Sequence, residues 1–481
     1  MEPLELAELI ERAGGRWVAA GPPPPLRVAE LATDSRTLPD QAIFVALQGE
    51  TFDGHAFIDD ARRRGALASI VSRERLGALS PGSGPYIAVD DPLAALEKVA
   101  RWNRSRLALE VVAITGSVGK TSTKEFLATI LSGGFRVKSA PKSFNNRIGV
   151  AATLLSATPS TEVLVVELGT SGPGELSHLS RVVSPGRIIL TEIGPSHLEG
   201  LRDLDGVIAA KAEVFEGLRP GGTAFIRDGV AGFERFAAAA AGPVKTFGWG
   251  TGDLAVTDSR RVSLGRHDPA DYGYHFTVNG SENFLLPVPG RHNVLNATAA
   301  ISVARDLGMR WDEIRSSLSS CRLPPLRFQV IEEAGIVIVD DSYNSSPRSL
   351  DAAIDEWLEL GANGVAVLGD MLEMGGASRS LHEAAGRRLA TAEPRLLVTV
   401  GRESRHIAEA YAGLGGAAPT AHFEVWSDCV PFLEAELRRG DRVLFKGSRR
   451  IHLDLAVKDL RSRLAARSKG SNGNGGASKK T

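Results

Sequence analysis

Short apolar runs alternate with amphipathic stretches along the chain, and their spacing predicts an α/β fold. In the first hundred residues, the apolar runs predict short strands at Ala42–Leu47, Ser69–Val71 and Tyr86–Val89. The following segment DPLAALEKVARWNRSRL predicts a helix that closes this part of the chain. Asp91 is placed as its N-cap and Pro92 at its first helical position, which are the positions these residue types favour.

A new pattern starts at Val111, where VVAIT is typical of a buried parallel strand. Strands and helices then alternate through EVLVVELG, PGELSHLSRV, RIILTEIG and DGVIAAKAEVFEGL. Regular βαβ spacing of this kind predicts a doubly wound parallel sheet. Between about 243 and 287 the pattern is richer in strands and less regular, and RHNVLNATAAISVARDLG then predicts a long helix.

Pro324 and Pro325 in CRLPPLRFQV cannot continue a helix and predict a domain junction. From Gly335 to about Ala465 a second α/β unit follows, with strands GIVIVDD, GVAVLGD, RLLVTVG and RVLFKGS. The last segment, SKGSNGNGGASKKT, has no large aliphatic or aromatic residue, so it predicts a disordered tail. We therefore predict three α/β domains at 1–107, 108–323 and 324–467, and a tail at 468–481.

Composition and charge exclude several classes of protein. The 481 residues carry 56 Lys and Arg against 57 Asp and Glu, a net charge of −1, which argues against a nucleic-acid binder with a broad basic face. The two cysteines, Cys321 and Cys429, cannot form a disulfide framework or a cysteine zinc site. No apolar run approaches the ~20 residues of a membrane span, and the start MEPLELAELIERAGG is acidic, unlike a signal peptide. We expect a cytoplasmic protein without membrane insertion.

The strongest single motif is a glycine loop between a strand and a helix, VVAITGSVGKTSTKEFLATIL. Gly116 and Gly119 let the backbone approach a polyphosphate, which the N–H groups at the helix N-terminus can surround. Lys120 would contact the β- and γ-phosphates, and the Thr121 hydroxyl would bind Mg²⁺. The spacing is a tighter variant of G-x-x-x-x-G-K-[ST], because Ile114 stands where the first glycine belongs. An ordinary glycine turn is the simpler interpretation, but the flanking strand and helix favour nucleotide binding.

Three polar residues follow this loop at successive strand–helix junctions. Glu167 ends the apolar strand EVLVVELG, at the edge where open α/β sheets bind ligands. His197 lies in EIGPSHLEGL and Lys211 in VIAAKAEVFEGL. Taken singly, such a histidine is more often an ordinary loop residue and such a lysine a solvated helix residue. Together they would converge on one edge of the sheet, which makes them candidate metal ligands.

The combination of motifs resembles the Mur ligases. The resemblance rests on TGSVGKTS, SFNNRIGV, VVELGTSGPGEL, SHLEGL followed by AAKAEVF, GRHNVLNATAA, DDSYNSSP, LGDMLEMG and LFKGSR. It covers about residues 30 to 455, and TDSRTLPDQAIFVALQGETFDGHAFI is similar to the family's uridine-nucleotide domain. Within the family, SFNNRIGV, LGDMLEMG and DDSYNSSP look like the motifs of the members that add D-Ala-D-Ala.

The resemblance implies a fold, an activity and cofactors. It implies a small α/β domain for the uridine nucleotide, a central doubly wound P-loop ATPase domain, and a C-terminal Rossmann-like domain that closes over ATP and carries the dipeptide. The implied reaction joins D-Ala-D-Ala to UDP-MurNAc-tripeptide through an acyl phosphate, with ATP converted to ADP and phosphate, in peptidoglycan precursor synthesis. ATP and two Mg²⁺ ions are the implied cofactors, small molecules are the implied partners, and we expect a monomer.

The resemblance also implies roles for individual residues. Lys120, Lys211 and His197 are the implied catalytic groups, with Lys211 carbamylated. The implied ATP contacts are Gly116, Ser117, Val118, Gly119, Lys120, Thr121, Ser122, Asn293, Arg327 and Asp341. The implied metal ligands are Thr121, Glu167, His197 and the carbamate of Lys211. The implied substrate contacts are Asp34, Ser35, Arg36, Asn145, Asn146, Tyr343 and Asn344.

Three alternatives stay open at this point. A sister Mur ligase that adds a diamino acid typically has a histidine motif where this chain has Tyr343-Asn344, and an Asn-Pro-Arg motif where it has LGDMLEMG. A folylpolyglutamate synthetase lacks the uridine-nucleotide domain. A nucleotide-binding regulatory module without ligase activity would not need Glu167, His197 and Lys211 together. Departures from the family pattern at GASRS and SSP concern the dipeptide contacts, and the tripeptide could end in meso-diaminopimelate or lysine.

Overall fold

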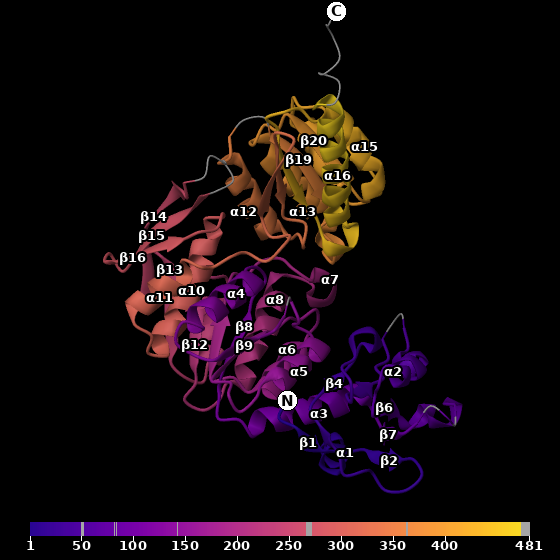
Figure 1. Cartoon of the computed structure of the whole chain (residues 1–481). Coiled ribbons are helices and arrows are strands. Elements are labelled where there is room, and N and C mark those ends of the chain that lie inside the picture. The colour runs from indigo at the N-terminus through magenta and orange to yellow at the C-terminus, as the bar shows by residue number, and fades with distance from the viewer. Residues whose placement is uncertain are drawn as a thin grey trace, which may run out of the picture.

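The computed structural model describes residues 1–49, 52–80, 82, 84–141, 143–265, 272–361 and 364–472. In this part of the chain the strands form four sheets, distributed over three α/β domains. The N-terminal and C-terminal domains lie at opposite ends of the molecule, with the central domain between them (Figure 1). The predicted α/β class with three domains is confirmed, whereas the boundaries after 107 and 323 stay a prediction.

The N-terminal domain contains a sheet with the strand order β2-β7-β6-β5-β4 and a separate antiparallel pair, β1 and β3. Its elements are β1 (Leu4–Glu5), α1 (Leu6–Ala13), β2 (Arg16–Val18), β3 (Arg27–Val28), β4 (Leu31–Ala32), β5 (Ile43–Val45), α2 (Ile58–Arg63), β6 (Ala68–Ser72), β7 (Tyr86–Val89) and α3 (Pro92–Ser105). The predicted start of α3 is confirmed, because the Asp91 side chain accepts a hydrogen bond of 2.8 Å from the backbone N–H of Leu93.

The central domain is built on a sheet with the order β16-β15-β14-β13-β12-β11-β8-β10-β9. Its first part contains β8 (Glu110–Thr115), α4 (Lys120–Leu131), β9 (Val137–Ser139), α5 (Arg147–Ser156), β10 (Val163–Glu167), α6 (Glu175–Val183), β11 (Arg187–Leu190), α7 (Leu198–Leu201), α8 (Leu204–Ala212) and β12 (Thr223–Arg227). Its second part contains α9 (Phe233–Ala239), β13 (Val244–Trp249), β14 (Leu254–Ser263), β15 (Tyr272–Val278), β16 (Glu282–Leu286), α10 (His292–Asp306) and α11 (Trp311–Leu318).

The predicted parallel sheet extends from β9 to β14, but the pairs β14–β15 and β15–β16 are antiparallel. The turn between β15 and β16 contains Asn279 and Gly280, which have positive φ angles of 48° and 70°. A short turn with positive φ angles is typical of a hairpin of antiparallel strands. This antiparallel extension accounts for the irregular pattern between 243 and 287.

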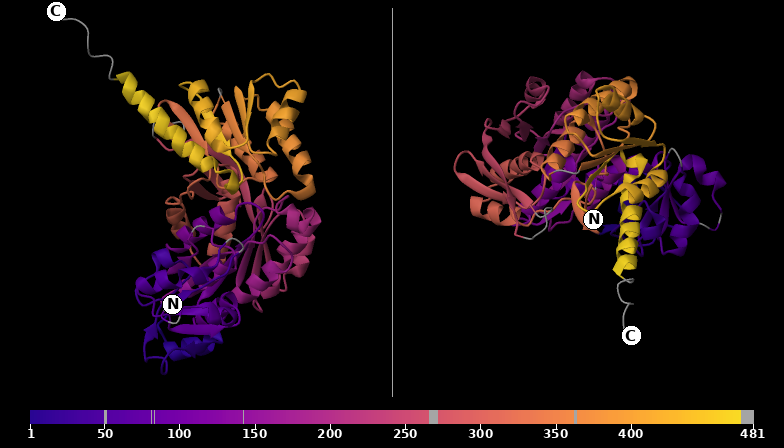
Figure 2. Two further views of the ribbon diagram at one scale, coloured as in Figure 1. Left: turned by 90° about the vertical axis from the view of Figure 1, so that its right-hand side faces the viewer. Right: turned by 90° about the horizontal axis from the view of Figure 1, so that it is seen from above.

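The C-terminal domain has the strand order β17-β18-β22-β19-β20-β21, with β17 antiparallel to β18 at one edge. Its elements are β17 (Gln329–Glu333), β18 (Ile336–Asp340), α12 (Pro347–Leu358), β19 (Gly364–Gly369), α13 (Ser378–Ala390), β20 (Leu396–Val400), α14 (Arg405–Gly413), β21 (Thr420–Phe423), α15 (Trp426–Glu436), β22 (Arg442–Lys446) and α16 (Leu453–Asn472). Figure 2 shows α16 extending beyond the rest of this domain.

The predicted disordered tail starts at residue 468, but α16 continues to Asn472. The prediction is therefore wrong for 468–472, because a helix already formed adds further turns at a low cost per residue, even through polar sequence. Residues 473–481 of the predicted tail lie outside the described part of the chain.

Apolar packing joins the domains to one another. One continuous core cluster contains Phe126 and Ile130 of α4 together with Trp357 of α12 and Met371, which follows β19. A second cluster joins the N-terminal domain to the other side of the central sheet.

Within the described part of the chain, no helix combines the length and the apolar character that crossing a membrane requires.

Candidate active site

A cavity of about 1090 Å³ lies between the central and C-terminal domains. It brings together most of the residues that the sequence singles out. Those on its wall are Ser117, Val118, Gly119, Lys120, Thr121, Ser122, Asn145, Glu167, His197, Asn293, Arg327, Asp341, Tyr343 and Asn344. Both domains therefore contribute to one site.

Strand β8 leads into the predicted phosphate loop, residues 116–119, and α4 begins after it at Lys120. Gly116 and Gly119 have positive φ angles of 147° and 92°, a region that side chains rarely tolerate. A Cβ atom on Gly116 would also lie 2.0 Å from Thr191 Oγ1, so this glycine permits a close approach of the loop to β11. Lys120 Nζ donates a hydrogen bond of 2.8 Å to the carbonyl oxygen of Gly116. Burial lowers the pKa of Lys120, an effect that a nearby polyphosphate would oppose.

Glu167 is the central acceptor of a hydrogen-bond cluster at the carboxyl edge of the sheet. The residue is 1% exposed and ends β10, opposite Ile114 of β8. Glu167 Oε2 accepts from Thr121 Oγ1 at 2.9 Å, and Oε1 accepts from Asn145 Nδ2 at 2.9 Å. Ser143 Oγ lies 3.1 Å from Thr121 Oγ1. The cluster joins the phosphate loop to the SFNNRIGV loop through a buried carboxylate.

Lys211 lies near the C-terminal end of α8 and is 1% exposed. Burial holds the pKa of its amine well below the usual range, and the positive charge of Lys120 lowers it further. The carboxylates of Glu167 and Glu175 act in the opposite direction. The side chain is not among the residues on the cavity wall. Lys211 is therefore near enough to the site to interact with its charges, although it is not one of the residues that line the cavity.

His197 precedes α7 with a left-handed backbone, φ 52°. Its imidazole lines the cavity, and its Nδ1 atom lies 2.5 Å from Oε2 of Glu373. Glu373 belongs to the LGDMLEMG segment of the C-terminal domain. The contact therefore crosses the interface between the two domains.

Arg327 brings a positive charge from the C-terminal side into the phosphate loop. Its Nη2 atom donates a hydrogen bond of 2.8 Å to Thr121 Oγ1. Its guanidinium carbon lies 4.3 Å from the centroid of the Tyr343 ring, a distance typical of a cation–π contact. The aromatic ring and the hydroxyl together fix the guanidinium at the cavity wall.

Lys446, at the end of β22, holds the segment after β18. Its buried Nζ atom donates to Asp341 Oδ2 at 2.6 Å and to the carbonyl oxygen of Asn344 at 3.1 Å. Asp341 Oδ1 accepts a further hydrogen bond of 3.1 Å from the backbone N–H of Phe328. Asp341 therefore connects three segments of the C-terminal domain at the cavity, and the same lysine positions Asn344.

The GRHNVLN segment forms another part of the wall. Asn293 is buried in the first turn of α10, where its Nδ2 atom donates to Pro289 O at 2.8 Å. Asn293 Oδ1 accepts from Asn296 Nδ2 at 3.0 Å. Nearby, the guanidinium of Arg291 lies 4.6 Å from the ring centroid of Trp249. An aromatic face and buried amides line this part of the cavity beside the phosphate loop.

Three family models match consecutive parts of the chain: "Mur ligase family, catalytic domain" over 27–104, "Mur ligase middle domain" over 114–304, and "Mur ligase, glutamate ligase domain" over 326–449. The UDP-N-acetylmuramoyl-tripeptide–D-alanyl-D-alanine ligase of Bacillus subtilis (strain 168) is 34% identical over 436 residues, which cover 89% of this chain and 92% of that protein. The chain belongs to the Mur ligase family.

Further relatives match most of the length of this Mur ligase. The enzyme of the same name from Escherichia coli (strain K12) is 33% identical over 448 residues, 89% of this chain and 93% of that one. A crystal structure of MurF from Acinetobacter baumannii superimposes with a TM-score of 0.85 at 29% identity, covering 96% of this chain and 99% of that one. MurF from Thermotoga maritima in complex with ADP gives 0.77 at 27% identity, with 91% and 98% covered.

Several predicted contacts of this Mur ligase lie away from the cavity wall. Asp34 is the N-cap of a short 3-10 helix in the N-terminal domain and pairs with Arg36, whose hydrogen bonds lower the pKa of Asp34 to about 2. Ser35 between them is buried. Asn146 accepts from the backbone N–H of Gly149 at 2.9 Å and so caps α5. The structure places Asn145 at the cavity, but not its neighbour Asn146.

Two buried charged residues on the cavity wall of this Mur ligase were missed by the sequence analysis. Lys446 lies in the LFKGSR motif, where a lysine that ends an apolar strand is the signal that could have found it. Glu356 of α12 accepts hydrogen bonds from the hydroxyls of Tyr272 at 2.5 Å and Tyr274 at 2.8 Å, and from Arg291 N at 2.9 Å. Glu356 therefore ties the C-terminal domain to β15 and to the start of α10, a long-range contact without a local sequence signal.

Among the described residues, no group of three or more His, Cys, Asp or Glu side chains is arranged to hold a metal ion. The donors that do meet are the Thr121 hydroxyl and the Glu167 carboxylate. Mg²⁺ prefers oxygen donors, and it usually binds one or two carboxylates together with substrate phosphates and water. The oxygen pair at the end of β10 therefore fits Mg²⁺ better than it fits a structural zinc ion.

Proposed function

We propose that this Mur ligase joins D-Ala-D-Ala to UDP-N-acetylmuramoyl-tripeptide, with conversion of ATP to ADP and phosphate. The activity named for the Bacillus subtilis and Escherichia coli relatives supports the proposal, and so does the ADP bound by the Thermotoga maritima neighbour. One observation carries it: the buried link from Glu167 through Thr121 to Arg327. Residues 117–122, the Glu167 carboxylate and the Arg327 guanidinium line one cavity, which supports the proposal.

In the first step, a carboxylate oxygen of the tripeptide attacks the γ-phosphorus of ATP and ADP leaves, which gives an acyl phosphate. The free carboxylate cannot acylate an amine at a useful rate, because its leaving group is poor. The protein holds two anions together and stabilises the charge that moves between them. Lys120, Arg327 and the N–H groups at the start of α4 are the proposed donors to the phosphates.

In the second step, the amine nitrogen of D-Ala-D-Ala bonds to the acyl carbon and loses a proton. The bond between the acyl carbon and the phosphate oxygen breaks, and phosphate leaves with its electron pair. Water would hydrolyse the acyl phosphate, so the C-terminal domain must cover the site and exclude water from it. Tyr343 and Asn344 are the proposed dipeptide contacts, because Lys446 and Arg327 fix them on the cavity wall. Asn293 is the proposed adenine contact in the neighbouring part of the wall.

The oxygen donors Thr121 and Glu167 are the proposed holders of Mg²⁺, with His197 at the same wall as a further ligand. When bound, the ion supplies charge neutralisation between the phosphates. Glu167 is held for this role by Asn145, whose amide orients one oxygen while the other faces the Thr121 hydroxyl. Two ions are the number that the family resemblance implies.

Lys211 is the proposed site of carbamylation. Because burial lowers the pKa of its amine, a larger fraction is neutral near neutral pH, and the neutral amine is the form that reacts. The amine nitrogen bonds to the carbon of CO₂ and releases one proton, which leaves a carbamate anion. An ammonium group beside Glu167 would repel a cation, whereas a carbamate offers the oxygen atoms that Mg²⁺ prefers.

Asp34, Ser35 and Arg36 remain the proposed contacts of the uridine nucleotide in the N-terminal domain, and Asn146 the proposed contact of the muramoyl-peptide. A monomer suffices for the reaction, because one chain supplies both sides of the cavity. We further propose domain boundaries at 107/108 and 323/324, and a cytoplasmic location near the uridine-nucleotide substrate.

The proposal is tested by ADP release from the purified full-length protein. Release should require ATP, a UDP-MurNAc-tripeptide and D-Ala-D-Ala together, and should be slow with D-Ala alone. Parallel assays with tripeptides ending in meso-diaminopimelate and lysine identify the natural acceptor. Preference for free meso-diaminopimelate over the dipeptide would assign the chain to the sister ligase. ADP release that ignores both peptide substrates would overturn the ligase function.

A further inference from the structure

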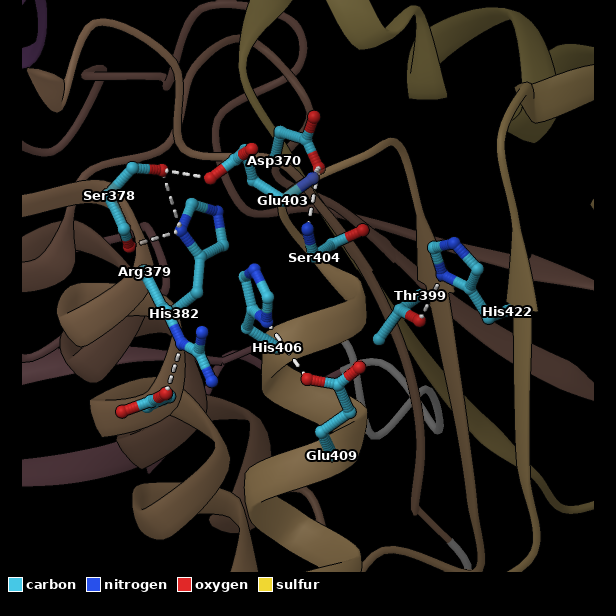
Figure 3. A network of polar contacts seen from close by, with 11 residues as sticks. Asp370, Ser378, Arg379, His382, Thr399, Glu403, Ser404, His406, Glu409 and His422 are labelled. Carbon is cyan, nitrogen blue, oxygen red and sulfur yellow. Dashed lines mark hydrogen bonds and ion pairs between the residues drawn. The ribbon is translucent and has the colours of Figure 1, made fainter. Parts of the chain in front are cut away.

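The LGDMLEMG segment leads from β19 towards α13 and is fixed at its start. Asp370 directly follows β19 and is buried. Its Oδ1 atom accepts hydrogen bonds from the backbone N–H groups of Glu403 at 3.1 Å and Ser404 at 2.8 Å, as Figure 3 shows for Ser404. Gly401 has a φ of 110°, and a Cβ atom there would lie 2.4 Å from the Asp370 carboxylate. The segment is therefore anchored to the loop between β20 and α14.

His382 of α13 holds the next residue of the segment. Its Nε2 atom accepts a hydrogen bond of 2.9 Å from the backbone N–H of Met371. Its Nδ1 atom lies 2.7 Å from the carbonyl oxygen of Ser378, a contact that Figure 3 shows. The first partner can only donate and the second only accept, so the ring is neutral with its proton on Nδ1. Leu372 N donates to Ser448 Oγ at 2.9 Å. Two consecutive N–H groups of the segment are thus held by buried side chains.

The anchored segment then contacts α7 of the central domain. The backbone N–H of Glu199 donates to the carbonyl oxygen of Glu373 at 3.1 Å. Gly375, with a φ of 52°, approaches so closely that a Cβ atom would lie 3.2 Å from Glu199 Cα. The side chains of Met371 and Met374 are buried on either side of Glu373. The backbone of Glu373 therefore has a defined position relative to α7.

The carboxylate of Glu373 contacts the imidazole of His197, with 2.5 Å between Oε2 and Nδ1. Both residues have left-handed backbones, with φ angles of 64° and 52°, a conformation that residues with a Cβ atom adopt rarely and that is found repeatedly at active sites. An ionised carboxylate can only accept, so the imidazole proton lies on Nδ1. In the neutral ring the Nε2 atom is then left with its lone pair, which is the form of histidine that binds a metal ion.

We propose that Glu373 is a positioning residue that sets the orientation and tautomer of His197 when the C-terminal domain is docked on α7. Docking of the C-terminal domain, which is proposed to bind the dipeptide, then completes the metal-ligand set of His197 and Glu167. The inference rests on the proposed ligase function, because it takes His197 as a metal ligand. The side chains of Glu373 and His197 are 45% and 29% exposed, so the pair adds little to stability. Its effect lies in orienting the ring.

The direct test compares Glu373→Ala with Glu373→Gln in the full-length protein. The control is Glu409→Ala, which removes the partner of His406 on α14, a contact of 2.9 Å within one helix (Figure 3). Nitrogen NMR of protein labelled with ¹⁵N-histidine reports the tautomer of each ring, and His197→Gln identifies the His197 signals. We expect His197 to carry its proton on Nδ1 in the wild type and to lose this preference in Glu373→Ala. Glu373→Gln should retain part of it, because an amide oxygen also accepts.

A second readout is the affinity for Mn²⁺ in the presence of ADP, measured by electron paramagnetic resonance. Loss of a carboxylate that orients a ligating histidine typically weakens metal binding about tenfold or more, so Glu373→Ala should do so and Glu409→Ala should not. Unchanged His197 signals, or an unchanged Mn²⁺ affinity, in Glu373→Ala would overturn the proposal. Neither measurement requires turnover, so failure of this inference and failure of the proposed ligase activity are distinguishable.

Discussion

Arg327, in the segment that enters the C-terminal domain, donates a hydrogen bond of 2.8 Å to Thr121 in the phosphate loop, 206 positions earlier in the chain. The same hydroxyl donates to the buried carboxylate of Glu167. A guanidinium from one domain and a carboxylate from another therefore meet at a single oxygen atom. Because phosphoryl transfer needs stabilisation of moving charge, this arrangement makes the proposed reaction depend on both domains.

Replacing Arg327 by alanine should slow ADP release strongly while leaving the protein folded. Removing one preorganised donor at developing charge costs about 2.7–4 kcal/mol, which corresponds to roughly 10²- to 10³-fold in kcat. Arg322→Ala is the matched control, because Arg322 is exposed on the same segment. Equal rates of ADP release in the two variants would remove Arg327 from the proposed site.

Lys120→Ala should slow turnover strongly without unfolding the central domain. The Lys120 ammonium donates to carbonyl oxygens of its own loop and interacts with the charge of Glu167. Glu167 keeps its hydrogen bonds from Thr121 and Asn145 when the lysine is lost, so the fold should persist. The missing phosphate contact should cost about 2–4 kcal/mol of transition-state stabilisation. Thermal unfolding and the ADP release assay separate the two effects. Lys138→Ala, an exposed lysine on the neighbouring β9, should behave as the wild type.

Local chemistry explains why the phosphate loop could be predicted from the sequence. Gly116, Gly119 and Lys120 act through backbone geometry and a helix N-terminus that they define themselves. The N-cap at Asp91 is equally local, and Glu167 marks the end of an apolar strand. Periodicity and capping therefore located the strand ends, which is where a doubly wound sheet binds its ligands.

Contacts between distant segments could not be predicted in this way. Glu373 and His197 are 176 positions apart, and their meeting depends on how the C-terminal domain docks. Glu356 likewise finds its tyrosine partners on an antiparallel extension that the βαβ pattern did not indicate. Lys211 lies on a predicted helix, but whether its amine faces the cavity depends on packing around α8. Tertiary packing, rather than local propensity, decides these three features.

Glu356→Ala should loosen the contact between α12 and β15. Burial raises the pKa of the Tyr272 and Tyr274 hydroxyls, and the negative charge of Glu356 raises it further. Both hydroxyls therefore remain donors across the working pH range. Without the acceptor, each buried donor left unpaired costs about 1–3 kcal/mol. We expect a lower unfolding temperature and a larger radius of gyration in X-ray scattering.

Glu383→Ala controls for this change, because Glu383 forms an exposed pair with Arg379 on α13. Glu356→Gln should fall between the wild type and Glu356→Ala, since its single amide oxygen can still accept. If Glu356→Ala matched Glu383→Ala in both measurements, the hydrogen bonds across this interface would not contribute to docking.

Lys211→Ala should be nearly inactive, and small carboxylates such as acetate or formate should restore part of the activity. The variant removes the proposed carbamate but leaves space at a buried position beside Glu167 and Lys120. A small carboxylate can return the oxygen donors there, as the proposed metal site requires. The activity at several acetate concentrations should therefore rise to a plateau.

Lys120→Ala provides the sharpest control for this rescue. The side chain it removes is proposed to act as a cation on phosphate, so an added anion should not replace it. In the wild type, ¹³C-labelled bicarbonate should give a carbamate signal in carbon NMR, and Lys211→Ala should lack that signal. Rescue of both variants by acetate would indicate a general salt effect. Absence of both the rescue and the signal would exclude the carbamate, and the ligase function would then rest on Lys120, Glu167 and Arg327.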